Sequence, residues 1–90
     1  MQKKETMNIS VEKRIGNNIR RLRECCGMTQ EILAARLQLG GCDITRSAVA
    51  KIEVGQRHLY VDEIIALKQI FDVPYDEIFL YFCVDRLNSN

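Results

Sequence analysis

The fold is decided by residues 27–55, which read GMTQEILAARLQLGGCDITRSAVAKIEVG. Thr29 and Thr45 each precede a run in which apolar residues recur at helical spacing, and threonine is a favourable residue at the start of a helix. Glycines follow both runs, as is common where a helix ends. The stretch therefore predicts two short helices, over 29–37 and 45–54, joined by a glycine-containing turn.

Helical spacing continues on both sides of this stretch. Upstream, apolar residues step by four, four, three and four positions, which predicts a helix capped by Ser10 and ended by Gly27. Downstream, a helix is predicted over 61–71, and Pro74 is well placed to start a fifth. The residues predicted to point inward are Val11, Ile15, Ile19, Leu22 and Cys26 in the first helix, Ile64, Leu67 and Phe71 in the fourth, and Ile78 and Phe79 in the fifth.

Length and composition agree with one small domain. The chain has 90 residues, 47% of them hydrophobic, which allows a single modest core. We expect an all-α, compact five-helix bundle over 11–84, a flexible N-terminal arm over 1–10 and a C-terminal tail over 85–90. No apolar run is long enough to span a membrane, and the N-terminus has no apolar segment of a secretory signal. The expected location is the cytoplasm.

The charges of the chain are unevenly distributed. Residues 1–57 carry 11 Lys and Arg against 6 Asp and Glu, whereas residues 58–90 carry 2 against 6, so the balances are +5 and −4. A basic half suits a polyanion such as DNA, with the acidic half facing away from it. An unevenly charged but merely solvated surface explains the same counts.

The two central helices have the form of a helix-turn-helix, because the second of them has a polar outer edge beside an apolar inner one. Val49 and Ile52 fall on the inner edge. The outer edge consists of Arg46, Ser47, Ala50, Lys51 and Val54. Many helical bundles share this pattern, so the pattern alone leaves the function open.

Several motifs, in order, resemble those of the phage-repressor/Cro superfamily, also called the xenobiotic-response-element family of transcriptional regulators. They are Ile19-Arg-x-Leu-Arg23, Gly27-Met-Thr-Gln-Glu-x-Leu-Ala34, Ser47-x-Val-x-Lys-Ile-Glu53, Gly55-x-Arg57 and Ile64…Leu67…Phe71-x-Val73. The resemblance covers about two-thirds of the chain. It implies a lambda-repressor-like fold that binds double-stranded DNA, with the helix over 45–54 as the recognition helix in the major groove.

The resemblance also implies roles for individual residues. Arg46 would contact a guanine edge, Ser47 and Lys51 a base or phosphate, and Gln30 a phosphate at its helix N-terminus. Arg57 would bind a phosphate. The full set of expected DNA-binding residues is Thr29, Gln30, Thr45, Arg46, Ser47, Ala50, Lys51, Gln56 and Arg57. Each of these side chains could instead be an ordinary solvated surface group.

Two further features follow from the same comparison. Arg23 and Glu53 resemble the internal salt bridge of the family, which joins the first helix to the end of the recognition helix. Seven residues, 38–44, separate the two central helices, and the usual turn of the family is several residues shorter. The longer turn affects the angle of the recognition helix and hence which side chains reach the bases.

The four cysteines are expected to be reduced thiols that are buried or incidental. They are Cys25, Cys26, Cys42 and Cys83. A thiol sensor or a soft-metal site that includes His58 is the alternative, but the spacing of paired metal ligands is missing. No metal, cofactor or catalytic residue is expected, and the chain is not expected to be an enzyme.

The leading hypothesis is a DNA-binding repressor that forms a homodimer, since one small module buries little DNA surface. The apolar run over 78–84 is the candidate dimer surface, although it could also simply close the core. The alternatives are a protein-interaction module that has kept the fold without DNA binding, or an antitoxin that uses this run to bind a protein partner. Binding to a membrane is not expected.

Overall fold

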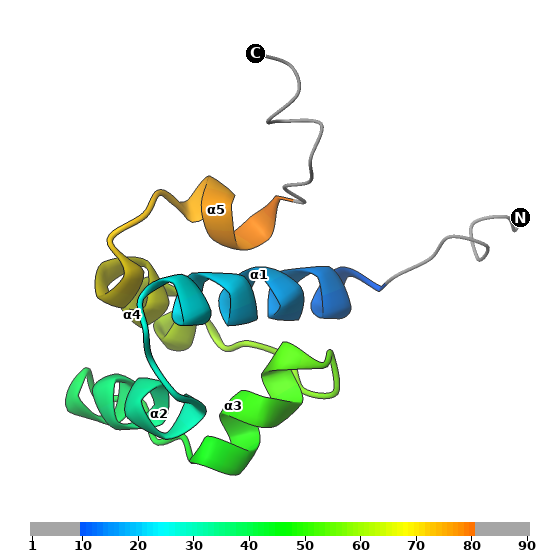
Figure 1. The fold of residues 1–90 in the computed structure, drawn as a ribbon. Coiled ribbons are helices and arrows are strands. Elements are labelled where there is room, and N and C mark those ends of the chain that lie inside the picture. Colours follow the sequence, from blue (N-terminus) through cyan, green and yellow to red (C-terminus); the bar gives the residue numbers. More distant parts are fainter. Residues whose placement is uncertain (1–9, 81–90) are drawn as a thin grey trace, which may run out of the picture.

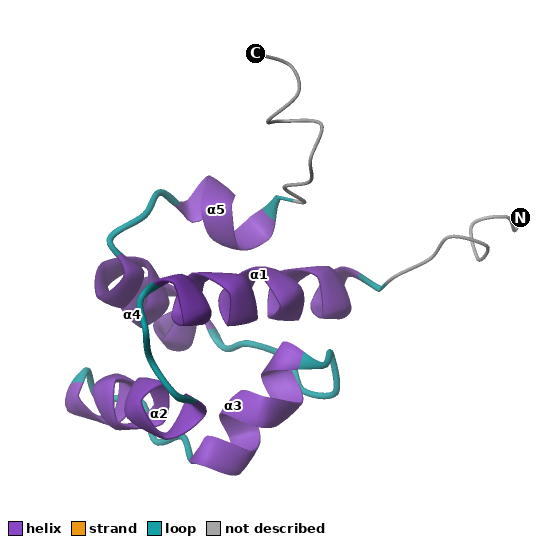
Figure 2. Ribbon diagram, viewed as in Figure 1, coloured by secondary structure: helices purple, strands orange, loops and turns teal. Residues whose placement is uncertain are grey.

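In a computed structural model, the chain is described over residues 10–80, and this part is all-helical (Figures 1 and 2). The helices in chain order are α1 (Val11–Cys25), α2 (Gln30–Leu39), α3 (Arg46–Glu53), α4 (Val61–Phe71) and α5 (Tyr75–Phe79). The expected all-α architecture with five helices is thereby confirmed. In this part of the chain, no helix is long and apolar enough to cross a membrane. Most of the expected arm, the whole tail and the run after Leu80 lie outside the described residues.

The predicted helix starts are confirmed by hydrogen bonds. Ser10, Thr29 and Thr45 each accept a hydrogen bond from the backbone N–H three residues later, at 3.1, 3.1 and 3.2 Å. Such a bond satisfies an N–H group that has no partner inside the helix. The helices therefore start one residue after each cap. Gly27 and Gly55 have φ angles of 72° and 81°, a region that glycine adopts without strain, and they turn the chain after α1 and α3.

The core lies where α1 meets the other helices. In Figure 1, α1 crosses the middle of the molecule, with α5 on one side and α2 and α3 on the other. The central side chains, which are at most 1% exposed, are Ile19, Leu33, Leu37, Val49, Leu67 and Ile78. Loop residues also contribute, since Met28, Cys42 and Ile44 are buried in the same cluster. Helical periodicity could not assign those three, because they lie between helices.

The inward positions predicted at the ends of α1 and α5 are partly wrong. Cys26 is exposed, because it follows the last residue of α1, where the chain turns toward α2 and no helix covers it. Val11, in the first turn, is 56% exposed, and Phe79, in the last turn of α5, is 43% exposed. Ile15 and Ile64 are only half-buried. The helical period of apolar residues continues to the end of a helix, but at these helix ends the other helices do not cover the side chains.

A close backbone approach fixes the angle between α1 and α3. A methyl group at Gly16 would lie 2.2 Å from the carbonyl oxygen of Ile52 and 2.7 Å from that of Glu53. Only glycine therefore allows α1 to lie against the last turn of α3 in this way. This contact sets the orientation of the predicted recognition helix.

The long turn between α2 and α3 is packed against the rest of the domain. Cys42 and Ile44 are buried, and the Cys42 N–H donates to the Leu37 carbonyl at 2.9 Å. The Gln38 side chain donates to the Ile44 carbonyl at 2.6 Å. The additional residues thus fold back on the end of α2, and the start of α3 is tied to it.

A buried asparagine fixes the position of α5. Asn18, on α1, is 4% exposed, and its Nδ2 donates to the carbonyls of Ile78 and Leu80 at 2.9 and 2.6 Å. A buried amide is stabilising only when such partners are present. The short helix α5 is therefore held by Ile78 in the core and by this pair of hydrogen bonds.

Candidate nucleic-acid interface

The outer edge of α3 is accessible, as the sequence predicts. Arg46, Ser47 and Lys51 are exposed, and Ala50 is half-buried. On the opposite side, the residues Val49, Ile52 and Glu53 are buried. Thr45 and Thr29 are exposed at the caps of α3 and α2, so both helix starts are open to solvent. A short, anchored helix thus presents two cations and a hydroxyl away from the core.

The expected ion pair between α1 and α3 is confirmed. Arg23 donates from Nε to Glu53 Oε2 at 2.6 Å and from Nη2 to Glu53 Oε1 at 3.0 Å. A third donor, Nη1, reaches the Met28 carbonyl at 2.8 Å. Arg23 and Glu53 are only 8% and 3% exposed. The hydrogen bonds to the Glu53 carboxylate raise the pKa of Arg23, although burial alone would lower it.

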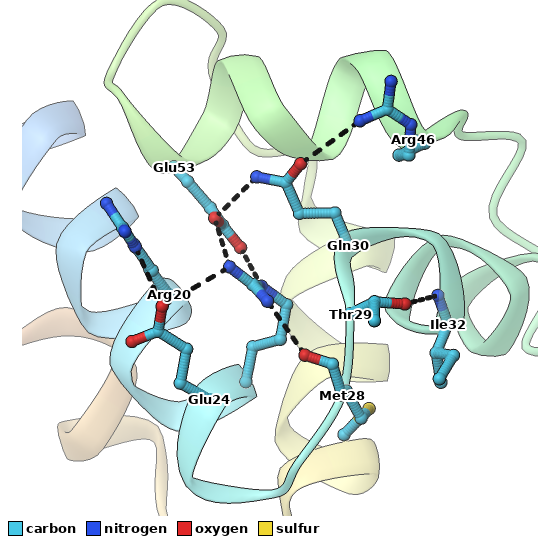
Figure 3. Close-up of polar contacts among 9 residues, drawn as sticks. Arg20, Glu24, Met28, Thr29, Gln30, Ile32, Arg46 and Glu53 are labelled. Atoms are coloured by element: carbon cyan, nitrogen blue, oxygen red, sulfur yellow. Dashed lines mark hydrogen bonds and ion pairs between the residues drawn. The ribbon is translucent and has the colours of Figure 1, made fainter.

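Gln30 joins this buried pair to the exposed edge of α3. Its Nε2 donates to Glu53 Oε1 at 3.0 Å, and its Oε1 accepts from Arg46 Nη1 at 3.5 Å. Figure 3 shows the Gln30 amide between Glu53 and Arg46, with Thr29 capping the start of α2 nearby. The sequence places Gln30 at a helix N-terminus but contains no signal for either side-chain contact.

Arg57 lies in a different setting from the rest of the expected DNA-binding set. Its Nη1 and Nη2 donate to the two carboxylate oxygens of Glu63 at 2.9 and 3.0 Å, and Nη1 also donates to the His58 carbonyl at 2.9 Å. Its guanidinium lies 4.7 Å from the ring centroid of Tyr60. The Arg57 side chain, which is 22% exposed, therefore braces the loop between α3 and α4. Gln56 beside it is exposed.

Glu63 is the structural residue that sequence reasoning missed. It occupies the first turn of α4, is 2% exposed, and accepts the Tyr60 N–H at 3.0 Å. A glutamate three residues after the helix cap is a known capping signal, and this signal could have placed the carboxylate at the start of α4. The ion pair of Glu63 with Arg57 depends on the path of the loop between α3 and α4, so the sequence could not have predicted it.

We expect the Arg57–Glu63 pair to make the free energy of unfolding depend on pH. Burial alone would raise the pKa of Glu63, but the hydrogen bonds from Arg57 and the Tyr60 N–H outweigh burial and lower it. A lowered folded-state pKa gives stability that is complete above the ordinary value of 4.5 and is lost as pH falls through the lowered value. Urea unfolding followed from pH 7 to pH 2 should show this loss.

The Glu63→Gln variant is the control for that loss, because it retains shape but cannot titrate. Its free energy of unfolding should be lower at pH 7 and should fall less below pH 4.5 than that of the parent chain. An equal acid dependence in both proteins would show that other carboxyls are responsible.

Within residues 10–80, the cysteines and the single histidine form no metal-binding cluster. Cys25 and Cys26 are exposed, whereas Cys42 is buried. Burial raises the pKa of the Cys42 thiol, and the carboxylates of Asp62 and Glu63 raise it further. His58 Nδ1 instead lies 3.1 Å from Glu12 Oε2. Over residues 10–80, no three metal-ligating side chains lie together; Cys83 is outside this range.

An anchored helix that presents cations beside the open N-terminus of a preceding helix is typical of the class of helix-turn-helix DNA-binding proteins. The model of the Helix-turn-helix family (HTH_3) matches residues 19–78, and the chain belongs to this family. The restriction-modification controller protein C.AhdI from Aeromonas hydrophila is similar in structure, with a TM-score of 0.64 and 34% sequence identity over 76% of this chain and 96% of that one. A comparison with curated protein sequences gave no match.

These comparisons confirm the type of protein that the sequence predicts. The chain is a DNA-binding transcriptional regulator of the helix-turn-helix type. The family is one of DNA-binding regulators and not of enzymes, and the similar protein C.AhdI is a controller protein.

Proposed function

We propose that the chain represses transcription by binding a specific double-stranded DNA site as a homodimer, with α3 in the major groove. The observation that carries this proposal is the exposed edge of α3, where Arg46, Ser47 and Lys51 lie opposite the buried Val49 and Ile52. Cationic and hydroxyl side chains at the start of a helix are suited to base edges and phosphates.

The proposed contacts are of two kinds: contacts to base edges, which read the DNA sequence, and contacts to phosphates, which position the protein on the duplex. Arg46 would donate to guanine O6 and N7, and Ala50 has the apolar surface that suits a thymine methyl group. Ser47 and Lys51 would contact a base edge or a phosphate. Phosphates would be held at the open N-terminus of α2, by Thr29 and Gln30. The exposed Gln56 and Thr45, the N-terminal cap of α3, would hold further phosphates. Arg57 would serve mainly by bracing the loop that carries Gln56.

The similarity to C.AhdI favours a particular regulatory role. That protein is a restriction-modification controller, and the match covers 96% of its length at 34% identity. We infer that this chain controls the genes of a restriction-modification system from the bacterial cytoplasm, where those genes are transcribed.

A homodimer is favoured by the apolar surface at the end of α5. Phe79 and Leu80 are 43% and 51% exposed, and they belong to the apolar run over 78–84. Exposed apolar surface of this kind is typical of interfaces. Two copies would also bury more DNA surface than one small module, whose contact area is limited.

The proposal is tested by selecting binders from a random duplex library at near-physiological salt. We expect one enriched site with two inverted halves about one helical turn apart, which would identify a sequence-specific dimer. A single enriched half would contradict the dimer, and sedimentation of the complex provides an independent measurement. Retention without enrichment would contradict sequence-specific recognition. No retention at all would favour the protein-interaction module or the antitoxin.

Arg46→Ala should weaken binding to the selected site by about 1–3 kcal/mol and relax the preference at one base pair. The reason is the loss of a bidentate contact to that base. Titrations against the selected duplex and its single-base variants measure both effects. Arg36→Ala, an exposed arginine on α2, is the matched control and should leave the base preference unchanged. If Arg46→Ala weakens binding to every duplex equally, Arg46 contacts phosphate instead.

A further inference from the structure

We propose that Lys13, in the first turn of α1, binds a DNA phosphate beside the loop that follows the recognition helix. This inference rests on the proposed function of the α3 edge. It adds a residue that lies outside the family resemblance, because the family model matches residues 19–78. The inference is drawn from the way in which the start of α1 packs against residues 55–58.

The start of α1 lies directly against the end of α3. A methyl group at Gly55 would lie 2.9 Å from Lys13 Cα and 3.0 Å from Lys13 Cβ. Three residues further along α1, Gly16 is in similarly close contact with the carbonyl groups of Ile52 and Glu53. Figure 1 shows the first turns of α1, in blue, beside the loop after α3, in green. The two backbone contacts therefore fix the position of Lys13 relative to the recognition helix.

A side-chain contact joins the same two segments. Glu12 Oε2 lies 3.1 Å from His58 Nδ1, and this contact is an ion pair when the imidazole is protonated. The carboxylate that precedes Lys13 in the sequence is thus directed to the loop, whereas the Lys13 side chain is exposed. Within residues 10–80, the Lys13 ammonium forms no ion pair. It is therefore available to an anion such as a phosphate.

The arginine of the loop is already engaged. The family resemblance assigns Arg57 to a phosphate, but both of its Nη groups donate to Glu63. Using Arg57 for DNA would separate it from a carboxylate that is 2% exposed, and a buried charge without its partner is costly. Lys13, which lies against Gly55 two positions before Arg57, can supply a positive charge at the loop without breaking this pair.

The end of α3 is a suitable place for a phosphate contact. The eight residues of α3 correspond to about 12 Å of helix, and the major groove is also about 12 Å wide. A helix of this length that crosses the groove brings the segments at its two ends close to the two backbones that border the groove. In the proposed complex, the open N-terminus of α2 faces one backbone. The exposed Gln56 and Lys13 face the other.

The test is the salt dependence of DNA binding by the parent chain and by Lys13→Gln. A phosphate contact releases counterions, so the slope of log affinity against log salt concentration should become shallower by about one for each bound protomer. At near-physiological salt, affinity should fall about three- to ten-fold for each protomer. The loss should be equal on the selected duplex and on random duplexes, because a phosphate carries no sequence information.

Two variants are the controls for this measurement. Lys13→Arg keeps the charge and should keep the salt slope of the parent chain. Arg36→Gln removes an exposed cation from the last turn of α2 and should leave the slope unchanged. A slope for Lys13→Gln equal to that of the parent chain would overturn the inference, as would a loss of affinity confined to some DNA sequences.

A phosphate contact from Arg57 predicts a different pattern. Arg57→Gln would then make the salt slope shallower and Lys13→Gln would not, which would overturn the proposed role of Lys13. We expect instead that Arg57→Gln lowers the free energy of unfolding, because Glu63 loses its partner, and leaves the salt slope of the folded protein unchanged.

A purely structural role of Lys13 predicts a third pattern. A cation next to the C-terminal end of α3 stabilises that helix, because the carbonyl groups there carry partial negative charge. Lys13→Gln would then lower the free energy of unfolding and leave the salt slope unchanged. Urea unfolding together with the salt titration distinguishes this role, which would also overturn the inference.

A direct observation of the ammonium group separates this inference from the proposed function. When duplex DNA is added, the NMR signal of the Lys13 ammonium should shift, whereas that of Lys68, on α4, should not. An unshifted Lys13 signal in a complex that does form would overturn the inference and leave the proposed function in place. If the parent chain binds no duplex, the proposed function fails, and the phosphate contact of Lys13 fails with it.

Discussion

Replacing Glu53 with alanine is expected to lower the free energy of unfolding by about 3–5 kcal/mol. The change leaves the Arg23 guanidinium, which is 8% exposed, without its carboxylate partner, and it also removes the partner of the Gln30 amide. An uncompensated buried charge costs more than the intact pair contributes. Urea unfolding at neutral pH is the direct measurement.

The chain contains a matched exposed pair for comparison. Arg20 Nε lies 3.1 Å from Glu24 Oε2, but these side chains are 61% and 55% exposed. Arg20→Ala, which leaves the 4.0 Å contact between Glu24 and Arg23 in place, should therefore cost less than about 1 kcal/mol, because solvent already screens the exposed pair. The double variant Arg23→Met/Glu53→Met should recover much of the loss, since neither charge is then buried alone. Equal costs for Glu53→Ala and Arg20→Ala would contradict the assigned burial of the Arg23–Glu53 pair.

Gly16→Ala is expected to destabilise the protein by about 3 kcal/mol, the upper end for overpacking a core. The added methyl group would lie 2.2 Å from the Ile52 carbonyl oxygen, and both sides of this contact are helix backbone that cannot rotate away. Relief requires α1 and α3 to separate, so DNA affinity should also fall in the fraction that remains folded. Thermal or urea unfolding, followed by DNA titration, measures both effects.

The destabilisation expected for Gly16→Ala is a stringent test, because helix propensity alone predicts the opposite effect. Alanine in the middle of a helix normally stabilises it by about 0.5–1 kcal/mol relative to glycine. Gly40→Ala is the matched control, since its methyl group would meet its nearest atoms at 3.5 Å and beyond. A stabilising effect of Gly16→Ala would show that α1 and α3 are not in close contact.

Much of the fold was predictable because its signals are local. The caps predicted at Ser10, Thr29 and Thr45 depend only on a hydroxyl and an N–H three residues later, and all three are present. The apolar period places Ile19, Leu22 and Leu67 correctly in the core. The same logic fails at Cys26, which follows the last residue of α1, and at Phe79, in the last turn of α5.

The candidate site likewise has features that could be predicted from the sequence and features that could not. The outward edge of α3 follows from helical geometry, and the Arg23–Glu53 pair follows from resemblance to a known family. The partners of Gln30 and Arg57 could not be derived, because each hydrogen bond requires a particular arrangement of separate elements. Arg57 shows the consequence, since the family resemblance implies a phosphate contact but gives no indication that its two Nη groups donate to Glu63.

The sequence by itself determined where helices begin, which side of each is apolar, and that a helix-turn-helix lies at residues 27–55. These properties depend on residues three or four positions apart. The tertiary structure alone decided that Gly16 must lie against α3, that Asn18 ties down α5, and that Gln30 connects a buried carboxylate to Arg46. Those contacts join residues 16 to 62 positions apart, and their geometry is set by how the helices pack.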